Sequence, residues 1–242
     1  MSGSKSKGRM RRVARFAVGG VTGLLAVVAT ATGIQWYWSA IVFSAAIVIM
    51  LGRRRIFRAG VTRRPDELVC RYIPWFESNA LFGFVLLPLI GISALAAGNA
   101  PDNPTWVRYV GLALLIVTPV IMFSVVSMWR RCILVFSPSA LTIRTAAPKD
   151  LLTEVPRHRV RTITPKIVPN GVSGESLQVE IVYETSDSNP DTKTVLLGLQ
   201  LTVQPSNLLD ALVAWKDATG DNPDELLDRI EGILHGRSSA VV

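Results

Sequence analysis

The sequence predicts an α+β membrane protein. Four transmembrane helices, arranged as two helical hairpins, are followed by a small antiparallel β domain with C-terminal helices. Three observations lead to this prediction. The first half of the chain contains four apolar stretches that are long enough to cross a bilayer. Basic residues are concentrated in the segments beside those stretches. After residue 131, apolar and polar residues alternate in short segments, which is typical of strands.

The composition separates the chain into two chemically different halves. Of the 242 residues, 49% are hydrophobic, and the mean hydropathy of +0.36 is too apolar for an ordinary soluble domain. Residues 1–131 contain 16 Lys and Arg against four acids, whereas residues 132–242 contain 10 against 14. Because the basic excess lies beside the apolar stretches, it indicates membrane topology and contact with anionic lipid headgroups. We expect no nucleic-acid partner.

The predicted transmembrane domain covers residues 13–131 and follows a polar, basic tail, residues 1–12, which we expect to be disordered. An uncharged turn with Gly33 separates the first two spans, which suits the outer face of the membrane. Gly19 and Gly23 form a small-xxx-small pair that allows close helix contact. The four spans are expected at about residues 14–33, 37–52, 79–98 and 105–129.

The basic loop between the second and third spans, residues 53–78, determines the predicted orientation. Arginine beside a hydrophobic span stays on the cytoplasmic side of the cell membrane, so both termini are expected to be cytoplasmic. Inside the loop, Pro65 and two acids resemble a helix start, and the apolar side chains from Leu68 onward predict a short interfacial helix on the inner leaflet. The alternative is a docking face for the C-terminal domain. The topology-determining residues are Arg53, Arg54, Arg55, Arg58, Arg63, Arg64, Arg71, Arg130 and Arg131.

Two independent features agree with this topology. Every basic residue of the first half except Arg108 falls in a predicted inner segment or, for Arg15, at the inner end of the first span. Tryptophans that mark the headgroup level lie at span ends or in the interfacial segment: Trp36, Trp38, Trp75, Trp106 and Trp129. No Asp, Glu, Lys or His lies in a predicted span centre, which counts against a proton-coupled transporter or an ion pump but leaves a passive pore open.

Residues 132–218 predict the β domain. Candidate strands begin at Ile133, Leu141, Leu152, Val160, Leu177 and Lys193, the last running to Val203 with a bulge at Gly198. Pro205 then opens an amphipathic helix with Leu208, Ala211, Leu212 and Trp215 on its apolar face. These elements predict a small barrel or sheet closed by the helix. Residues 219–242 form a second capped helix and a tail. Its apolar stripe is expected to pack on the domain, the alternative being a partner site.

Two stretches of this region resemble bacterial pleckstrin-homology-like (PH-like) domains. The segment Ile133–Arg144 is similar to their opening hairpin, and Val155–Ile163 is similar to their Ile-Pro-x-x-x-Ile-x-x-Ile segment. The closing helix with Trp215 is similar too, so the resemblance covers about residues 132–218. It implies a membrane-anchored binding or scaffolding module that is not an enzyme, with no catalytic residue.

The candidate binding residues form a basic set after the third predicted strand. Eukaryotic PH domains that bind phosphoinositides carry Lys and Arg in the first hairpin turn. Here that turn, Ser137–Ala140, has only Arg144 near it, so this type of binding is not expected. The basic set could instead bind lipid phosphates or an acidic partner, and the alternative is a solvated edge. It comprises Arg157, His158, Arg159, Arg161 and Lys166.

Three functional hypotheses follow. The favoured one is a PH-like binding or scaffolding module for a membrane or cytoplasmic protein partner or for anionic lipid. The second is a small transport or channel component acting as an oligomer. The third is a membrane enzyme, which no phosphate-binding loop, catalytic dyad or metal cluster supports. The two cysteines and two histidines have no metal-ligand spacing, so we expect no metal or cofactor and no disulfide.

Overall fold

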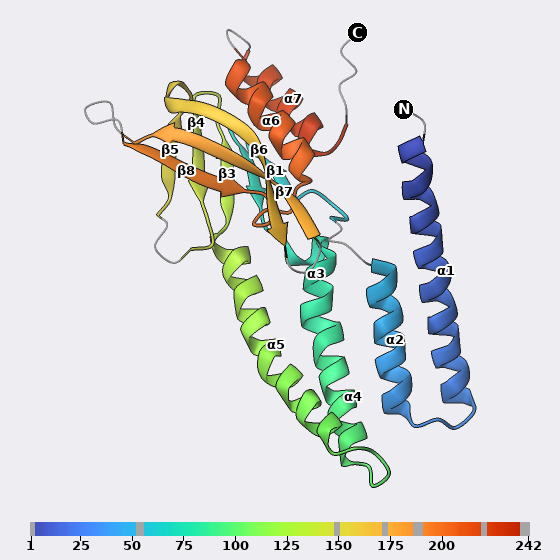
Figure 1. The fold of residues 1–242 in the computed structure, drawn as a ribbon. Coiled ribbons are helices and arrows are strands. Elements are labelled where there is room, and N and C mark those ends of the chain that lie inside the picture. The colour runs from blue at the N-terminus through green and yellow to red at the C-terminus, as the bar shows by residue number, and fades with distance from the viewer. Residues whose placement is uncertain are drawn as a thin grey trace. The chain divides into compact units, whose positions relative to one another are not determined.

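The computed structural model describes residues 3–51, 56–147, 151–170, 174–185, 191–218 and 222–237. Its contacts divide the chain into two compact units (Figure 1). The helical unit contains residues 1–55 and 78–124, and the β unit contains residues 56–77 and 125–242. The chain therefore passes from one unit to the other three times, and the β unit is assembled from two separate stretches of sequence.

The helical unit is built from apolar helices, as the sequence predicts. Among the described residues, three helices are long and apolar enough to cross a membrane: Val13–Ala31, Ser78–Asn99 and Trp106–Arg131. A fourth apolar helix, Trp36–Leu51, has 16 residues and is shorter than a usual span. The elements are α1 (Gly3–Ala31), α2 (Trp36–Leu51), α3 (Ser78–Leu81), a π-helical turn η2 (Phe82–Leu86), α4 (Leu87–Asn99) and α5 (Trp106–Arg131). The residues of α5 after Ser124 belong to the β unit.

The N-terminal segment differs from its prediction, because α1 begins at Gly3 and the disordered tail expected over residues 1–12 is wrong for residues 3–12. An established helix adds residues at little cost, since only nucleation is unfavourable. Lys, Arg and Met are good helix formers, so the apolar span carries its helix back through the basic segment. Composition alone underestimates this propagation from a neighbouring span.

Pro88 explains the π-helical turn between α3 and α4. Proline has no backbone N–H, and its ring clashes with the carbonyl group four residues earlier. The chain widens by one residue just before it, and the Leu87 N–H donates to the carbonyl oxygen of Phe82, five residues back. The helix from Ser78 to Asn99 is thus continuous but not uniformly α-helical.

Glycines permit close backbone approach in both hairpins of the helical unit. A Cβ atom on Gly19 would lie 3.1 Å from the carbonyl oxygen of Ala46, and one on Gly23 would lie 3.7 Å from the Ala46 Cβ, so the predicted close packing of α1 on α2 is confirmed. The α4–α5 pair is tighter. A Cβ on Gly111 would lie 2.4 Å from the backbone nitrogen of Leu95. Such contacts exclude larger side chains at that position.

The β unit contains two antiparallel sheets. One has the order β1-β2-β3-β4-β5 and the other the order β6-β7-β8. Helices α6 and α7 follow the sheets, and α6 packs on β6 and β7 (Figure 1). The strands are β1 (Val61–Arg63), β2 (Leu68–Arg71), β3 (Ile133–Phe136), β4 (Ala140–Arg144), β5 (Thr153–Pro156), β6 (Val160–Asn170), β7 (Gly174–Glu184) and β8 (Thr192–Leu197). The helices are η1 (Pro74–Phe76), η3 (Arg157–Arg159), α6 (Pro205–Asp217) and α7 (Pro223–Leu234).

The loop between the second and third apolar helices belongs to the larger sheet, so the interfacial helix predicted from Leu68 onward is wrong. Leu68 pairs with Phe136 and Arg71 pairs with Ile133 across β2 and β3. Leu68 and Cys70 are fully buried in the main core. A short apolar run does not distinguish a strand from a helix by periodicity, and here the neighbouring strand β3 decides. The alternative of a docking face was nearer to the observed arrangement.

One core holds the β unit together. It takes side chains from both sheets and from both C-terminal helices, and its largest fully buried member is Trp215. The predicted apolar face of α6 is confirmed, and the stripe of α7 packs into the same core. The last predicted strand, from Lys193 to Val203, is too long. Strand β8 ends at Leu197, and the chain leaves the sheet at Gly198, whose φ is +154°.

Candidate functional site

Arg157, the first member of the predicted basic set, serves the fold of the β unit. Its guanidinium carbon lies 5.1 Å from the ring centroid of Trp215, in a cation–π arrangement. Its Nη1 donates to the carbonyl oxygen of Ala218, just after α6. The Trp215 indole N–H in turn donates to the carbonyl oxygen of Ser137 at 2.7 Å. Arg157 and Trp215 together hold α6 against the turn between β3 and β4.

The other members of the basic set lie along β6 and the turn before it. Arg161 forms an ion pair with Glu184, and the Lys166 ammonium lies 2.6 Å from a Glu180 carboxylate oxygen. Both pairs join β6 to β7, so they neutralise part of the positive charge. His158 is exposed and Arg159 is half-buried in the turn η3. The structure therefore separates the five residues by role and does not gather them into one cationic pocket.

The turn η3 lies at the end of the larger sheet that is farther from α5. The Arg157 N–H donates to the carbonyl oxygen of Ser139, next to the start of β4. At the other end of β4, Arg144 pairs with Ile133, and its guanidinium donates to the carbonyl oxygens of Arg130 and Arg131, the last residues of α5. With about 3.3 Å per residue, β4 separates the two ends by roughly 13 Å.

The topology-determining arginines also have mixed environments. Arg63 lies 3.6 Å from Asp224 and 3.5 Å from Asp228, which ties β1 to α7. Arg64 is paired with Glu67, and Arg58 stacks over the Phe76 ring at 5.4 Å. The side chains of Arg71 and Arg130 are exposed, and that of Arg131 is half-buried. Arg53, Arg54 and Arg55 lie outside the described residues.

The five tryptophans predicted for the membrane interface are all exposed in the chain by itself. Trp36 and Trp38 open α2, Trp106 opens α5, and Trp129 lies in its last turn. Trp75 lies in η1, within the β unit. Tyr37, between the first two, is instead buried, and its hydroxyl oxygen accepts a hydrogen bond from the Asn103 amide at 3.2 Å.

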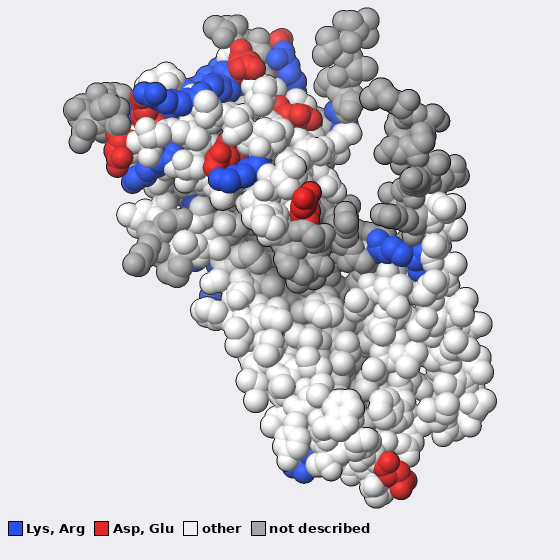
Figure 2. Space-filling model, in the orientation of Figure 1, with Lys and Arg blue, Asp and Glu red and all other residues white. Residues whose placement is uncertain are grey.

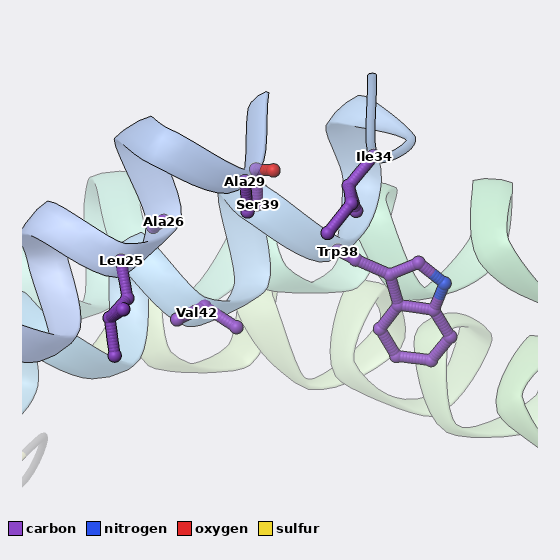
Figure 3. Close-up of a pocket in the computed structure, with 7 residues that line it drawn as sticks. All are labelled: Leu25, Ala26, Ala29, Ile34, Trp38, Ser39 and Val42. Atoms are coloured by element: carbon purple, nitrogen blue, oxygen red, sulfur yellow. The ribbon is translucent and has the colours of Figure 1, made fainter. Parts of the chain in front are cut away.

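Each unit has a hollow among its described residues. In the β unit, a cleft of about 420 Å³ lies between the two sheets. In the helical unit, a smaller groove of about 220 Å³ runs between α1 and α2, where Ser39 is the one polar side chain among seven lining residues (Figure 3). Neither hollow contains an acid–base pair. The cleft is lined by Ile143, Thr145, Leu151, Thr153, Tyr183, Lys193, Thr194 and Val195.

Both cysteines are buried, and their thiols have a raised pKa. Burial raises the pKa of the Cys70 thiol far above its ordinary range. Burial also raises the pKa of Cys132 to about 11, although Arg144 and Arg131 oppose the shift. Because the thiolate is the reactive form, neither side chain is suited to act as a nucleophile at neutral pH. Both thiols are free of disulfides.

Charge is distributed very differently over the two units. Figure 2 shows Lys, Arg, Asp and Glu gathered over the β unit, whereas the visible face of the helical unit carries them only near its ends. In the part of the chain that the structure describes, no group of three His, Cys, Asp or Glu could hold a metal ion. Comparisons with protein-family models, curated proteins and solved structures found no significant match.

Proposed function

We propose that this chain is a multi-pass membrane protein whose four apolar helices cross the cell membrane and present a cytoplasmic PH-like module to a protein partner. The module acts by binding and scaffolding and is not an enzyme. Helix α2 is the shortest of the four spans at 16 residues, or about 24 Å at 1.5 Å per residue. Local thinning of the bilayer accommodates a span of this length at modest cost.

The observation that carries the proposal is the pairing of β2 with β3. The loop between the second and third helices supplies part of the sheet that the C-terminal residues complete. The module is therefore covalently joined to the apolar helices at three points, instead of hanging from one linker. This arrangement suits a protein that displays a folded surface beside the membrane.

The element order supports a PH-like module. Antiparallel strands β3 to β8 belong to two sheets, and α6 follows them with Trp215 in the shared core. The proposed partner surface is the turn η3, where His158 is exposed beside Arg159 and Arg161. Because this turn lies at the far end of the sheet from α5, it suits an acidic protein partner better than the lipid of the same membrane.

Accessibility of single cysteines tests the topology. We expect a membrane-impermeant maleimide added to intact cells to label Asp102→Cys, between α4 and α5, and not His158→Cys. The two native thiols are buried, so the maleimide should not label them. Labelling of both positions, or of His158→Cys alone, would contradict the proposed orientation.

Photo-crosslinking tests the binding role in the full-length protein. A fragment that begins at residue 132 is unsuitable, since it lacks β1 and β2. A photoreactive residue at His158 should give one discrete protein adduct, which disappears in an Arg159→Glu/Arg161→Glu background. The same residue at Val213, exposed on α6, is the matched control and should give none. Equal adducts at both positions, or lipid adducts only, would refute the proposed partner surface.

A further inference from the structure

Large apolar side chains gather at one end of the β unit. Seven such residues are exposed among the described residues of this unit, and six of them lie at the end where α5 joins β3. The seventh, Val213, lies on α6. We call the six together the strand-end surface, and it consists of Phe57, Trp75, Trp129, Leu151, Leu152 and Ile167.

The strand register brings three of these residues together. Ile133, which follows α5 closely, pairs with Arg71 on one side and with Arg144 on the other. The chain beyond Arg71 contains Trp75, and the Phe57 N–H donates to the carbonyl oxygen of Phe76 at 2.8 Å. Phe57 and Trp75 therefore lie beyond the end of β2 at which α5 joins β3, and Trp129 lies in the last turn of α5.

The two leucines reach the same end through β5. Ile143, the neighbour of Arg144 in β4, pairs with Thr153, the first residue of β5. Leu151 and Leu152 come immediately before that strand, so the register places them beyond the α5 end of the sheet. Leu151 is 81% exposed, the highest value among the described large apolar residues of the β unit. Leu151 also lines the cleft between the two sheets, and the described residues leave it largely exposed.

Ile167 approaches this end from the smaller sheet. It pairs with Leu177, and the adjacent Gln178 lies against Gly198, where an added Cβ would be 3.2 Å from the Gln178 Cα. Two residues later, the Gln200 side-chain oxygen accepts a hydrogen bond from the Ala146 N–H at 3.4 Å and lies 4.0 Å from the Cys132 sulfur. The β6–β7 hairpin thus ends on the same side as the α5–β3 junction (Figure 1).

The β6–β7 hairpin also extends beyond the core that buries its other apolar side chains. Three successive pairs along β6 and β7 lie on the side that faces the core. The pair Ile163–Ile181 and the residue Val179 contact the core, and the pair Ile167–Leu177 follows them toward the hairpin end. Strand β8 pairs with β7 only from Val179 onward, so the last pair projects beyond the smaller sheet. Ile167 is 64% exposed there. An apolar stripe that continues past its own core indicates an external apolar contact.

Positive charge borders the same surface. The exposed side chain of Arg71 lies at the end of β2, and that of Arg130 lies in the last turn of α5. Arg58 stacks over Phe76, whose carbonyl oxygen accepts the hydrogen bond from Phe57. Tryptophan and arginine around an apolar centre are the residues that favour the headgroup level of an anionic bilayer. The chain itself continues from this end into its apolar helices, at Ser78 and at residue 124.

We propose that the strand-end surface lies in the headgroup region of the anionic membrane that holds the helices, with Ile167 and Leu151 entering the acyl boundary. This inference rests on the proposed membrane-spanning role of the helices. It adds that the β unit sits on the bilayer and is not held away from it. The turn η3, at the opposite end, is then directed toward the aqueous side.

Site-directed spin labelling of the full-length protein in nanodiscs tests the inference, because only introduced cysteines should react. Labels at Ile167→Cys and Leu151→Cys occupy two separate elements of the surface. Val213→Cys is the matched control, an exposed apolar position on the same unit. Phe123→Cys, 74% exposed on α5, reports whether the helix itself lies in lipid. The readout is the accessibility of each label to lipid-soluble oxygen and to a water-soluble nickel chelate.

Labels at Ile167 and Leu151 should be more accessible to oxygen than to the nickel chelate in nanodiscs that contain phosphatidylglycerol, and Val213 should show the reverse. Nickel accessibility equal to that of Val213 would overturn the inference. Exclusion of both reagents would overturn it too, since it would indicate protein contact. In either case, oxygen access at Phe123 would leave the membrane-spanning proposal intact. Loss of that access would refute both proposals.

Discussion

Leu68→Ala tests whether the loop between the second and third helices is part of the β unit. Leu68 is fully buried, and it lies in β2 opposite Phe136. Removing a buried leucine side chain to the β carbon costs about 2–5 kcal/mol, because transfer energy is lost and a cavity remains. Because Leu68 is fully buried, we expect Leu68→Ala to lower the free energy of unfolding of the β unit by about 3 kcal/mol.

The loss can be measured by pulse proteolysis of the full-length protein in nanodiscs over a urea series. With a urea m-value of about 1–3 kcal/mol per molar, a loss of about 3 kcal/mol lowers the unfolding midpoint by roughly 1–3 M. Leu134→Ala, in the adjacent strand β3 and also fully buried, is the positive control. Val213→Ala, at an exposed position of α6, should change stability by less than about 1 kcal/mol.

The comparison separates two arrangements of the loop. If Leu68 lay on an interfacial helix, as its sequence predicts, its truncation would weaken membrane contact and leave unfolding of the β unit unchanged. A Leu68→Ala midpoint that matches Val213→Ala and differs from Leu134→Ala would therefore refute the assignment of β2 to the sheet. The same result would remove the main support for a module joined to the helices at three points.

Three further predictions follow. Arg157→Ala should destabilise the β unit by about 1–3 kcal/mol in the same assay, through loss of the contact with the buried indole, whereas His158→Ala should have no effect. Gly111→Ala should lower the melting temperature of the helical unit, because the added Cβ would meet the backbone of α4 at 2.4 Å, while Gly20→Ala, with nothing within 4 Å, should not. Neither native cysteine should react with iodoacetamide at about pH 8: a pKa of about 11 leaves roughly 0.1% of Cys132 as thiolate, and burial blocks access. Rapid alkylation of the native protein would contradict their burial.

The sequence by itself determined the elements whose signals are local. Runs of apolar residues of sufficient length closely predicted the apolar part of α1, Val13–Ala31, the Ser78–Asn99 helix and α5, since span length and hydropathy need no knowledge of neighbours. Gly19 and Gly23 correctly indicated close helix packing. The apolar spacing of Leu208, Ala211, Leu212 and Trp215 predicted the buried face of α6, because a helix must bury its stripe against any available core.

Only the tertiary structure decided where short or charged segments belong. Leu68 to Arg71 became a strand because β3 offered an unpaired edge, and that partner lies more than 60 residues away in the chain. Tertiary contacts also gave the members of the basic set different roles. Arg157 packs over the Trp215 ring, and Arg161 and Lys166 form ion pairs with carboxylates on β7. Cross-strand and long-range partners determine both outcomes, and a single sequence does not record which residues meet.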